Sequence, residues 1–141
     1  AGAKAKAIVL RKEFTKEKDS FSIDYTSAYS TPNLDKLIRT FVYDRQGEGS
    51  FTVSDEFTAN APIRFETAVT TQADWKVLDD TRLLLTSGTE QMIVNIEASG
   101  KVAFTSETIE VNSPAYTRIG IALKEQSEKG YIRLMMQAKQ L

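Results

Sequence analysis

The sequence predicts an all-β fold: an antiparallel β-sandwich of two sheets, with roughly ten strands and little helix. Residues 37–57 place two runs rich in β-branched and aromatic residues on either side of the turn-forming segment 44–49, DRQGEG, which is the pattern of a β-hairpin. Turn signals then recur about every ten residues, as in sandwiches. No stretch shows a convincing amphipathic helical period.

The first half of the chain is predicted to alternate strands and loops. Residues 21–25 alternate apolar and polar side chains, which is typical of a half-buried strand. Pro32 and its small polar neighbours predict a loop over 27–33, and Asn60-Ala61-Pro62 is predicted to break the chain again. The other strands predicted here are 5–14, the two arms of the hairpin and 63–69.

One segment of this half has a second interpretation. Leu34, Leu37 and Ile38 fall at helical spacing within residues 30–40. Any helix is therefore expected to be a turn or two near residues 30–37.

The second half is predicted to contain short strands joined by tight turns. Trp75 and Val77 form a strand that ends at Asp79-Asp80. The strands expected after it are 82–86, 92–96, 102–111, 116–123 and 131–137, separated by turns or breaks at 87–89, 99–100, 112–114 and 126–130. The side chains expected to be largely buried are Phe21, Ile23, Phe51, Val53, Phe65, Val94, Ile96, Ile119, Ile121 and Leu134.

Length and charge narrow the functional classes. The 141 residues suit one domain, 1–141, and the chain starts without Met, so a processed or excised piece is expected. Eighteen basic and nineteen acidic residues leave a net charge of −1 without a concentrated basic face, which argues against nucleic-acid binding. No apolar run reaches the roughly 20 residues of a membrane span.

Side-chain chemistry is sparse. The chain has no histidine and no cysteine, which excludes Ser–His and Cys–His catalysis, disulfides and zinc–thiolate sites. Asp55-Glu56 are strand neighbours that point to opposite faces, so they make a poor catalytic dyad. Asp79-Asp80 is better interpreted as a turn than as a calcium site, because no calcium-loop pattern surrounds it. No catalytic residue, metal or cofactor is predicted.

The best polar cluster lies on the central hairpin. Arg39 and Tyr43 share strand parity and Arg45 falls in the turn. One interpretation is an arginine fork that binds carboxylate or sulfate beside a tyrosine hydroxyl. The alternative is a solvated strand face with a cation–π contact. Trp75 suits either a sugar-stacking platform or half-buried core. Arg39, Tyr43, Arg45 and Trp75 are therefore the candidate contacts to a substrate or a neighbouring domain.

The tyrosines also raise the possibility of a phenolic base. Such a base needs surroundings that lower its pKa from about 10. Tyrosine is also a favoured strand residue, so packing is the simpler role. The tyrosines concerned are Tyr25, Tyr29, Tyr43, Tyr116 and Tyr131.

Several segments together carry a family resemblance. They are AKAIVL near the start, Arg39-Thr40-Phe41-Val42-Tyr43, VSDEF at 53–57, FETAVTT at 65–71, Trp75 and TRIGI at 117–121. With these segments the chain resembles the C-terminal β-domain of the bacterial heparinase II/III-like polysaccharide lyase family.

The resemblance implies a larger parent, with an α-helical toroid followed by antiparallel sheets, that cleaves uronic-acid glycans by β-elimination. The family's catalytic tyrosine, asparagine and histidines have no counterparts here. The resemblance therefore implies a non-catalytic domain that packs against and supports the catalytic portion. Its implied partners are the remaining domains of the lyase and an acidic polysaccharide, with no nucleic acid and no membrane, and its implied location is periplasmic or secreted in a bacterium.

Two other classes stay open from the residues alone. An independent carbohydrate-binding or adhesion-type module predicts an exposed aromatic row on one sheet face and glycan affinity that depends on Trp75. A calcium-stabilised structural domain predicts a thermal shift with calcium.

Overall fold

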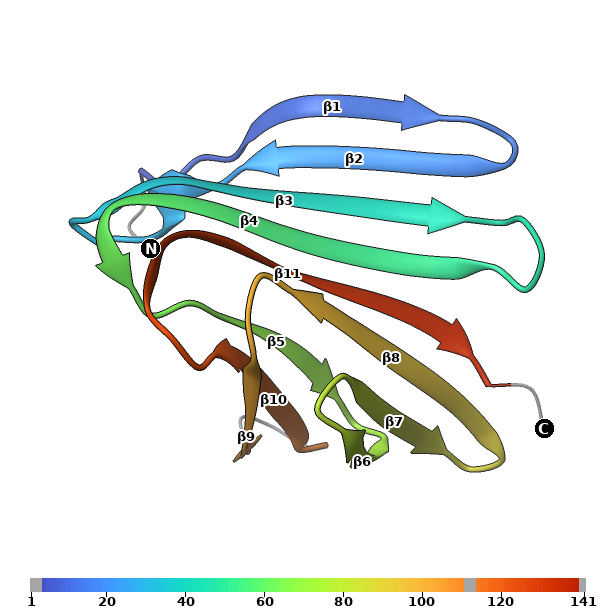
Figure 1. Cartoon of the computed structure of the whole chain (residues 1–141). Helices are drawn as coiled ribbons and strands as arrows, with labels where there is room; N and C mark the ends of the chain where they lie inside the picture. The colour runs from blue at the N-terminus through green and yellow to red at the C-terminus, as the bar shows by residue number, and fades with distance from the viewer. Residues whose placement is uncertain (1–3, 111–113, 140–141) are drawn as a thin grey trace.

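The protein forms two antiparallel β-sheets that pack face to face (Figure 1). The structure is a computed structural model, and it describes residues 4–110 and 114–139. The described residues contain eleven strands and one short 3₁₀ turn, η1, so the predicted sandwich is confirmed. The strands are β1 (Ile8–Phe14), β2 (Lys18–Asp24), β3 (Leu34–Asp44), β4 (Ser50–Ile63), β5 (Glu66–Thr71), β6 (Asp74–Asp79), β7 (Arg82–Ser87), β8 (Glu90–Ala98), β9 (Val102–Ile109), β10 (Tyr116–Leu123) and β11 (Ser127–Ala138), and η1 is Thr26–Ala28.

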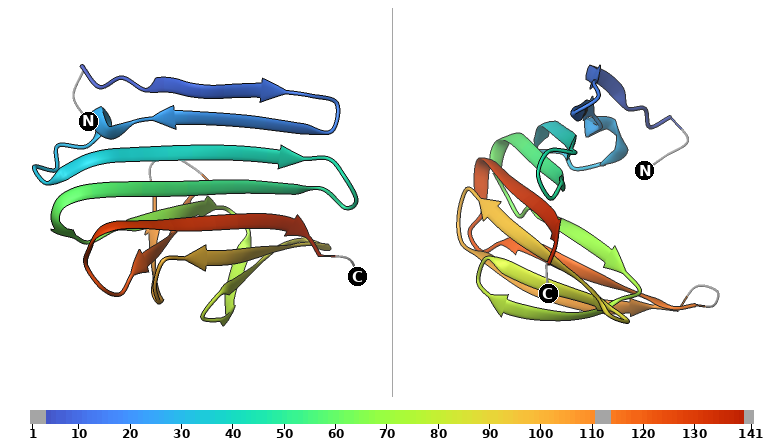
Figure 2. Two further views of the ribbon diagram at one scale, coloured as in Figure 1. Left: turned by 45° about the horizontal axis from the view of Figure 1, so that its top comes forward. Right: turned by 90° about the vertical axis from the view of Figure 1, so that its right-hand side faces the viewer.

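The two sheets differ greatly in size. The large sheet has eight strands in the order β1-β2-β3-β4-β11-β8-β7-β6, and the small sheet has three in the order β5-β10-β9. The end-on view in Figure 2 shows that the β1–β2 hairpin extends beyond the small sheet. The large sheet is therefore covered on its inner face only in part. No helix in the described part of the chain is long and apolar enough to cross a membrane.

The hairpin that the sequence predicts over residues 37–57 is formed by β3 and β4 of the large sheet. Asp44 pairs with Ser50 at the turn, and the register continues back to Leu37 opposite Phe57. Gly47 and Gly49 in the connecting turn both have positive φ, 59° and 74°, a conformation that glycine adopts without the steric cost of a side chain.

The core lies where the small sheet covers the large one. Six of the ten side chains predicted to be buried are buried: Phe65, Val94, Ile96, Ile119, Ile121 and Leu134. Phe21, Ile23 and Val53 are only half-buried, and Phe51 is 38% exposed, so the prediction was wrong for these four. They lie on β2 or toward the turn end of β4, away from the part of the large sheet that packs against the small one.

Two predictions from the sequence are corrected by the strands that form. The segment 30–37 contains no helix, because Leu34 and Leu37 pair with Ala59 and Phe57 of β4. Pro62 does not break the chain, since β4 continues to Ile63.

The last turn is also shorter than predicted, because β11 begins at Ser127. The other predicted strands match observed ones within a few residues. Residues 111–113, at the predicted end of one strand and the following break, lie outside the described residues.

The two Ser-Gly turns offer a matched test of backbone strain. Gly88 has φ +60° and Gly100 has no positive φ, while an added Cβ would meet nothing within 4 Å at either position. Gly88→Ala is therefore expected to lower the free energy of unfolding by about 1–2 kcal/mol. Gly100→Ala should change it by no more than about 0.5 kcal/mol, or raise it slightly by restricting the unfolded chain. Urea unfolding of both variants checks the difference; equal values would contradict the strain at Gly88.

Candidate functional site

A buried carboxylate organises the polar centre of the domain. Asp55 of β4 lies directly opposite Arg39 of β3 and is only 1% exposed. The Arg39 guanidinium binds it with two bonds, Nε to Oδ1 at 2.6 Å and Nη2 to Oδ2 at 2.7 Å. The Tyr25 hydroxyl donates to Oδ1 at 3.0 Å, and the Thr67 hydroxyl donates to Oδ2 at 2.7 Å. Both carboxylate oxygens are thereby satisfied, which a buried charge requires.

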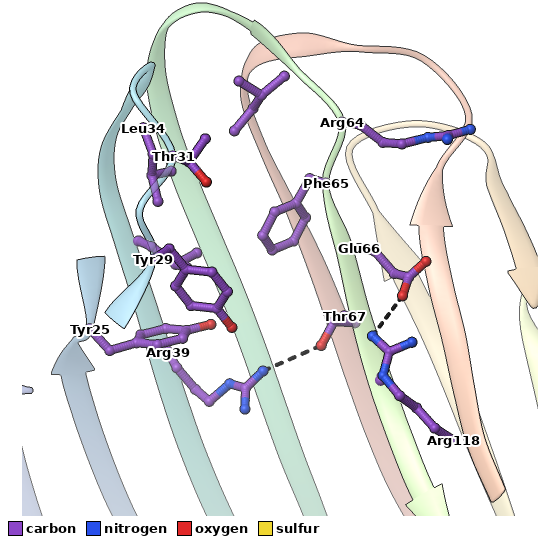
Figure 3. A pocket seen from close by; sticks show the side chains of 13 residues that line it. Tyr25, Tyr29, Thr31, Leu34, Arg39, Arg64, Phe65, Glu66, Thr67 and Arg118 are labelled. Atoms are coloured by element: carbon purple, nitrogen blue, oxygen red, sulfur yellow. Dashed lines mark hydrogen bonds and ion pairs between the residues drawn. The ribbon is translucent and has the colours of Figure 1, made fainter. Parts of the chain in front are cut away.

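This cluster joins the two sheets. Arg39 and Asp55 belong to the large sheet and Thr67 to the small one. Arg39 Nη2 also lies 3.4 Å from the Thr67 hydroxyl, the contact marked in Figure 3. The cluster therefore fixes the small sheet at one position along β3 and β4.

The electrostatics of the cluster favour structure over acid–base chemistry. Burial and the neighbouring Asp55 raise the pKa of Tyr25 well above its ordinary value of 10. The hydrogen bonds to Asp55 raise the pKa of Arg39 further above its already high value, and its guanidinium lies 5.4 Å from the centroid of the Tyr25 ring. A phenolic base needs the opposite shift. Tyr25 is thus held as a neutral hydrogen-bond donor.

A pocket of about 450 Å³ opens beside this cluster (Figure 3). Tyr25, Tyr29 and Arg39 line one side, while Arg64 and Glu66 belong to the segment that leads into β5 on the other. Figure 3 shows Arg64 directed away from Arg39.

Arg118, a second arginine that lines the pocket, already pairs with carboxylates. Arg118 contacts Glu66 at 2.7 Å and Glu107 at 3.7 Å. Two of the pocket's three arginines, Arg39 and Arg118, are therefore neutralised by carboxylates. The pocket offers hydroxyl and guanidinium donors for a polar ligand, but its net positive charge is small.

The predicted contact residues do not converge on one site. Arg45 forms an ion pair with Asp19, and its guanidinium lies 4.8 Å from the centroid of the Tyr43 ring at the turn end of the hairpin. Arg39 shares a sheet face with Tyr43 but binds Asp55 instead. Trp75 lies on β6, at the far edge of the large sheet, where it is half-buried against the core. The structure thus joins Tyr43 with Arg45 and leaves Arg39 and Trp75 elsewhere.

Sequence reasoning missed the partnership of Asp55, although one signal for it was present. Once the turn fixes Asp44 opposite Ser50, counting back along both strands places Arg39 opposite Asp55. Thr67 lies in another sheet, so no local pattern could have identified it.

The acidic pairs behave as the sequence suggested. Asp55 is buried and Glu56 exposed, as expected of strand neighbours. The Asp79 carboxylate accepts a hydrogen bond from the Thr81 backbone N–H at 2.9 Å and another from Arg82 at 2.7 Å, as a turn-stabilising residue does. Across residues 4–110 and 114–139, no three or more Asp, Glu, His or Cys side chains gather in a way that could hold a metal ion.

The raised pKa of Tyr25 makes a prediction about alkaline stability. Because the unfolded tyrosine ionises near its ordinary value of 10 and the folded one does so only at higher pH, stability present below pH 10 is lost as the pH rises above it. Tyr25→Phe should flatten this alkaline decline. Thermal unfolding from pH 8 to 11 measures it, with Tyr116→Phe as the control; an unchanged slope for Tyr25→Phe would contradict the assignment.

Comparison with known proteins identifies the fold. Neither the protein-family models nor the curated protein sequences contain a match to this chain. Among solved structures, a heparinase III superposes with a TM-score of 0.69 at 18% identity, over 94% of this chain and 21% of its own. Heparan sulfate lyase HepC from Pedobacter heparinus gives a TM-score of 0.70 at 15% identity, over 96% of this chain and 22% of its own. The chain thus has the fold of a part of these proteins and spans about a fifth of their length.

Proposed function

We propose that the chain is a non-catalytic C-terminal β-sandwich domain of a heparinase II/III-like polysaccharide lyase, and that it packs against and supports the catalytic portion. The observation that carries the proposal is the superposition of 96% of this chain on only 22% of a heparan sulfate lyase. In this proposal the parent enzyme cleaves a uronic-acid glycan such as a glycosaminoglycan by β-elimination, in the periplasm of a bacterium or outside the cell.

The chemistry of the described residues is consistent with a structural, non-catalytic role for this domain. β-Elimination needs a base that removes a proton next to a carboxylate, and a group that protonates the departing oxygen. Asp55 already accepts four hydrogen bonds, and Tyr25 is held neutral by burial. The hydrogen bonds of Asp55 to Tyr25, Arg39 and Thr67 occupy these groups in linking the two sheets. The partners proposed for the domain are therefore the other parts of the lyase.

An activity assay of two proteins tests the proposal. The isolated chain and the complete gene product that contains it are incubated with heparin, heparan sulfate, alginate and hyaluronan. Elimination creates an unsaturated uronate that absorbs in the ultraviolet. We expect this absorbance from the complete gene product on at least one glycan and none from the isolated chain. Robust turnover by the isolated chain, or none by the complete product on any acidic glycan, would overturn the proposal.

An independent carbohydrate-binding module is the second candidate, favoured by the exposed aromatic side chains on the large sheet. A binding module of this kind predicts that Trp75 lies in an exposed row of aromatic side chains that binds the glycan. In the structure Trp75 is half-buried against the core. Calorimetric titration of the isolated chain with the same glycans distinguishes the candidates, because only a binding module gives saturable heat that Trp75→Ala reduces.

A further inference from the structure

A second apolar cluster lies outside the core, on the inner face of the large sheet. Five aromatic side chains form it, and we call them the inner aromatic face: Phe14, Phe21, Phe41, Tyr43 and Phe51. None of the five belongs to the buried core. Phe14, Tyr43 and Phe51 are 68%, 46% and 38% exposed.

The strand register places all five on the same side of the sheet. Paired residues of antiparallel strands project to the same face. One row across the sheet runs Phe14, Asp19, Tyr43, Phe51 and Met136, and the next runs Lys12, Phe21, Phe41, Val53 and Leu134. The rings of Phe21, Phe41 and Phe51 follow one another with centroids 6.4 and 6.3 Å apart. Since Leu134 and Met136 belong to the core or pack on it, the inner aromatic face continues the core surface beyond the small sheet.

The opposite face of the same strands is more polar, although Ile8, Ile38 and Val42 also project to it. It carries small hydroxyl side chains, and Ser22 and Thr40 hydrogen-bond across it at 2.8 Å. Sheets with one apolar and one polar face bury the apolar one. A continuous exposed apolar patch of this kind marks a protein-interaction surface.

We propose that the inner aromatic face is the surface on which the remainder of the lyase polypeptide packs. This inference rests on the proposed function. Two observations select this occupant. The fold accounts for only 21–22% of the heparinase III and heparan sulfate lyase chains, and three aromatic side chains of the face, Phe14, Tyr43 and Phe51, are exposed.

The charges on the face argue against an acidic glycan as the occupant. Arg45 is paired with Asp19 and Arg39 with Asp55, which leaves Lys12 at the edge strand. A sulfated or carboxylated chain needs several free cations. Phenylalanine rings also supply no hydrogen bonds to sugar hydroxyls. An apolar protein layer fits the face better than a polyanion.

Thiol accessibility tests the proposal, because the chain has no cysteine of its own. Three single variants are made in the complete gene product: Tyr43→Cys at the centre of the face, Phe14→Cys at its edge, and Ile8→Cys as the control. Ile8 and Phe14 lie on the same strand with similar exposure, 62% and 68%, but project to opposite faces. Alkylation of each introduced cysteine is measured by mass spectrometry of the peptides that come from this chain. Cysteines in the rest of the gene product therefore do not affect the result.

We expect Tyr43→Cys and Phe14→Cys to react at least about tenfold more slowly than Ile8→Cys in the complete product, and at similar rates to it in the isolated chain. Equal rates for all three in the complete product would overturn the proposal, whether or not the isolated chain folds. Protection in the isolated chain that grows with its concentration would assign the face to a second copy. Protection only after a glycan is added would assign it to substrate, and either result also overturns the proposal.

Lyase activity is measured on the same samples. An active enzyme with a reactive Tyr43→Cys refutes the docking face alone, and a protected face without activity refutes the proposed function alone.

Discussion

Arg39→Met is expected to lower the free energy of unfolding by about 3–5 kcal/mol, because it removes one partner of a buried ion pair. Asp55 would stay 1% exposed with its charge uncompensated and with only the hydroxyls of Tyr25 and Thr67 as donors. The cost arises mainly from the stranded carboxylate and less from the net strength of the original pair.

Urea unfolding of the isolated chain measures this cost. Arg82→Met is the control, because Arg82 pairs with Asp79 at the surface, where ion pairs contribute about 0–1 kcal/mol. Adding Asp55→Asn to Arg39→Met should restore at least about 1 kcal/mol, since the amide removes the charge and keeps an acceptor oxygen. A loss of less than about 1 kcal/mol for Arg39→Met would show that the cluster does not hold the sheets together.

Ile121→Asp is expected to prevent folding. Ile121 is fully buried in the central strand of the small sheet, between Thr67 of β5 and Phe104 of β9. The change loses about 1.5–3 kcal/mol of apolar burial and adds several kcal/mol for a buried, unpaired carboxylate. Together these terms approach or exceed the 5–15 kcal/mol that stabilise a typical domain.

Circular dichroism and urea titration show the result. We expect Ile121→Asp to lose the β-sheet spectrum and to unfold without a cooperative transition. Leu78→Asp serves as the control, because Leu78 is 39% exposed on β6 and should lose no more than about 1 kcal/mol. A wild-type transition for Ile121→Asp would contradict the placement of β10 in the core.

The local pattern was enough to predict the fold but not the extent of burial. Alternation along residues 37–57 correctly predicted the hairpin, since period-two spacing and a glycine-containing turn both act within one short segment. The same alternation marked Phe21 and Phe51 as inward-facing, and they do face inward. Alternation identifies a face without telling whether another layer covers it, so these residues were wrongly assigned to the core.

Helical spacing misled the interpretation of residues 30–37 for a related reason. Leu34 and Leu37 occur at i and i+3, but their pairing with β4 decides their conformation, and that pairing is a tertiary property. The polar cluster around Asp55 also combines a local and a tertiary contact. The register of the hairpin places Arg39 opposite Asp55, whereas the contact with Thr67 depends on how the two sheets stack. Strand register along the hairpin can therefore predict the Arg39–Asp55 pair, but it cannot predict the contact of Asp55 with Thr67.

Kinetics of the Arg39→Met variant of the complete gene product test most directly whether this domain supports the enzyme without performing its chemistry. The turnover number and KM are measured well below the unfolding temperature, alongside the midpoint of thermal inactivation. Our account predicts turnover and KM within about twofold of the unmodified enzyme. It also predicts a midpoint lowered by about 5 °C or more, because the buried pair stabilises the fold. A turnover number reduced by about a hundredfold with an unchanged midpoint would place Arg39 in the reaction itself and contradict the account.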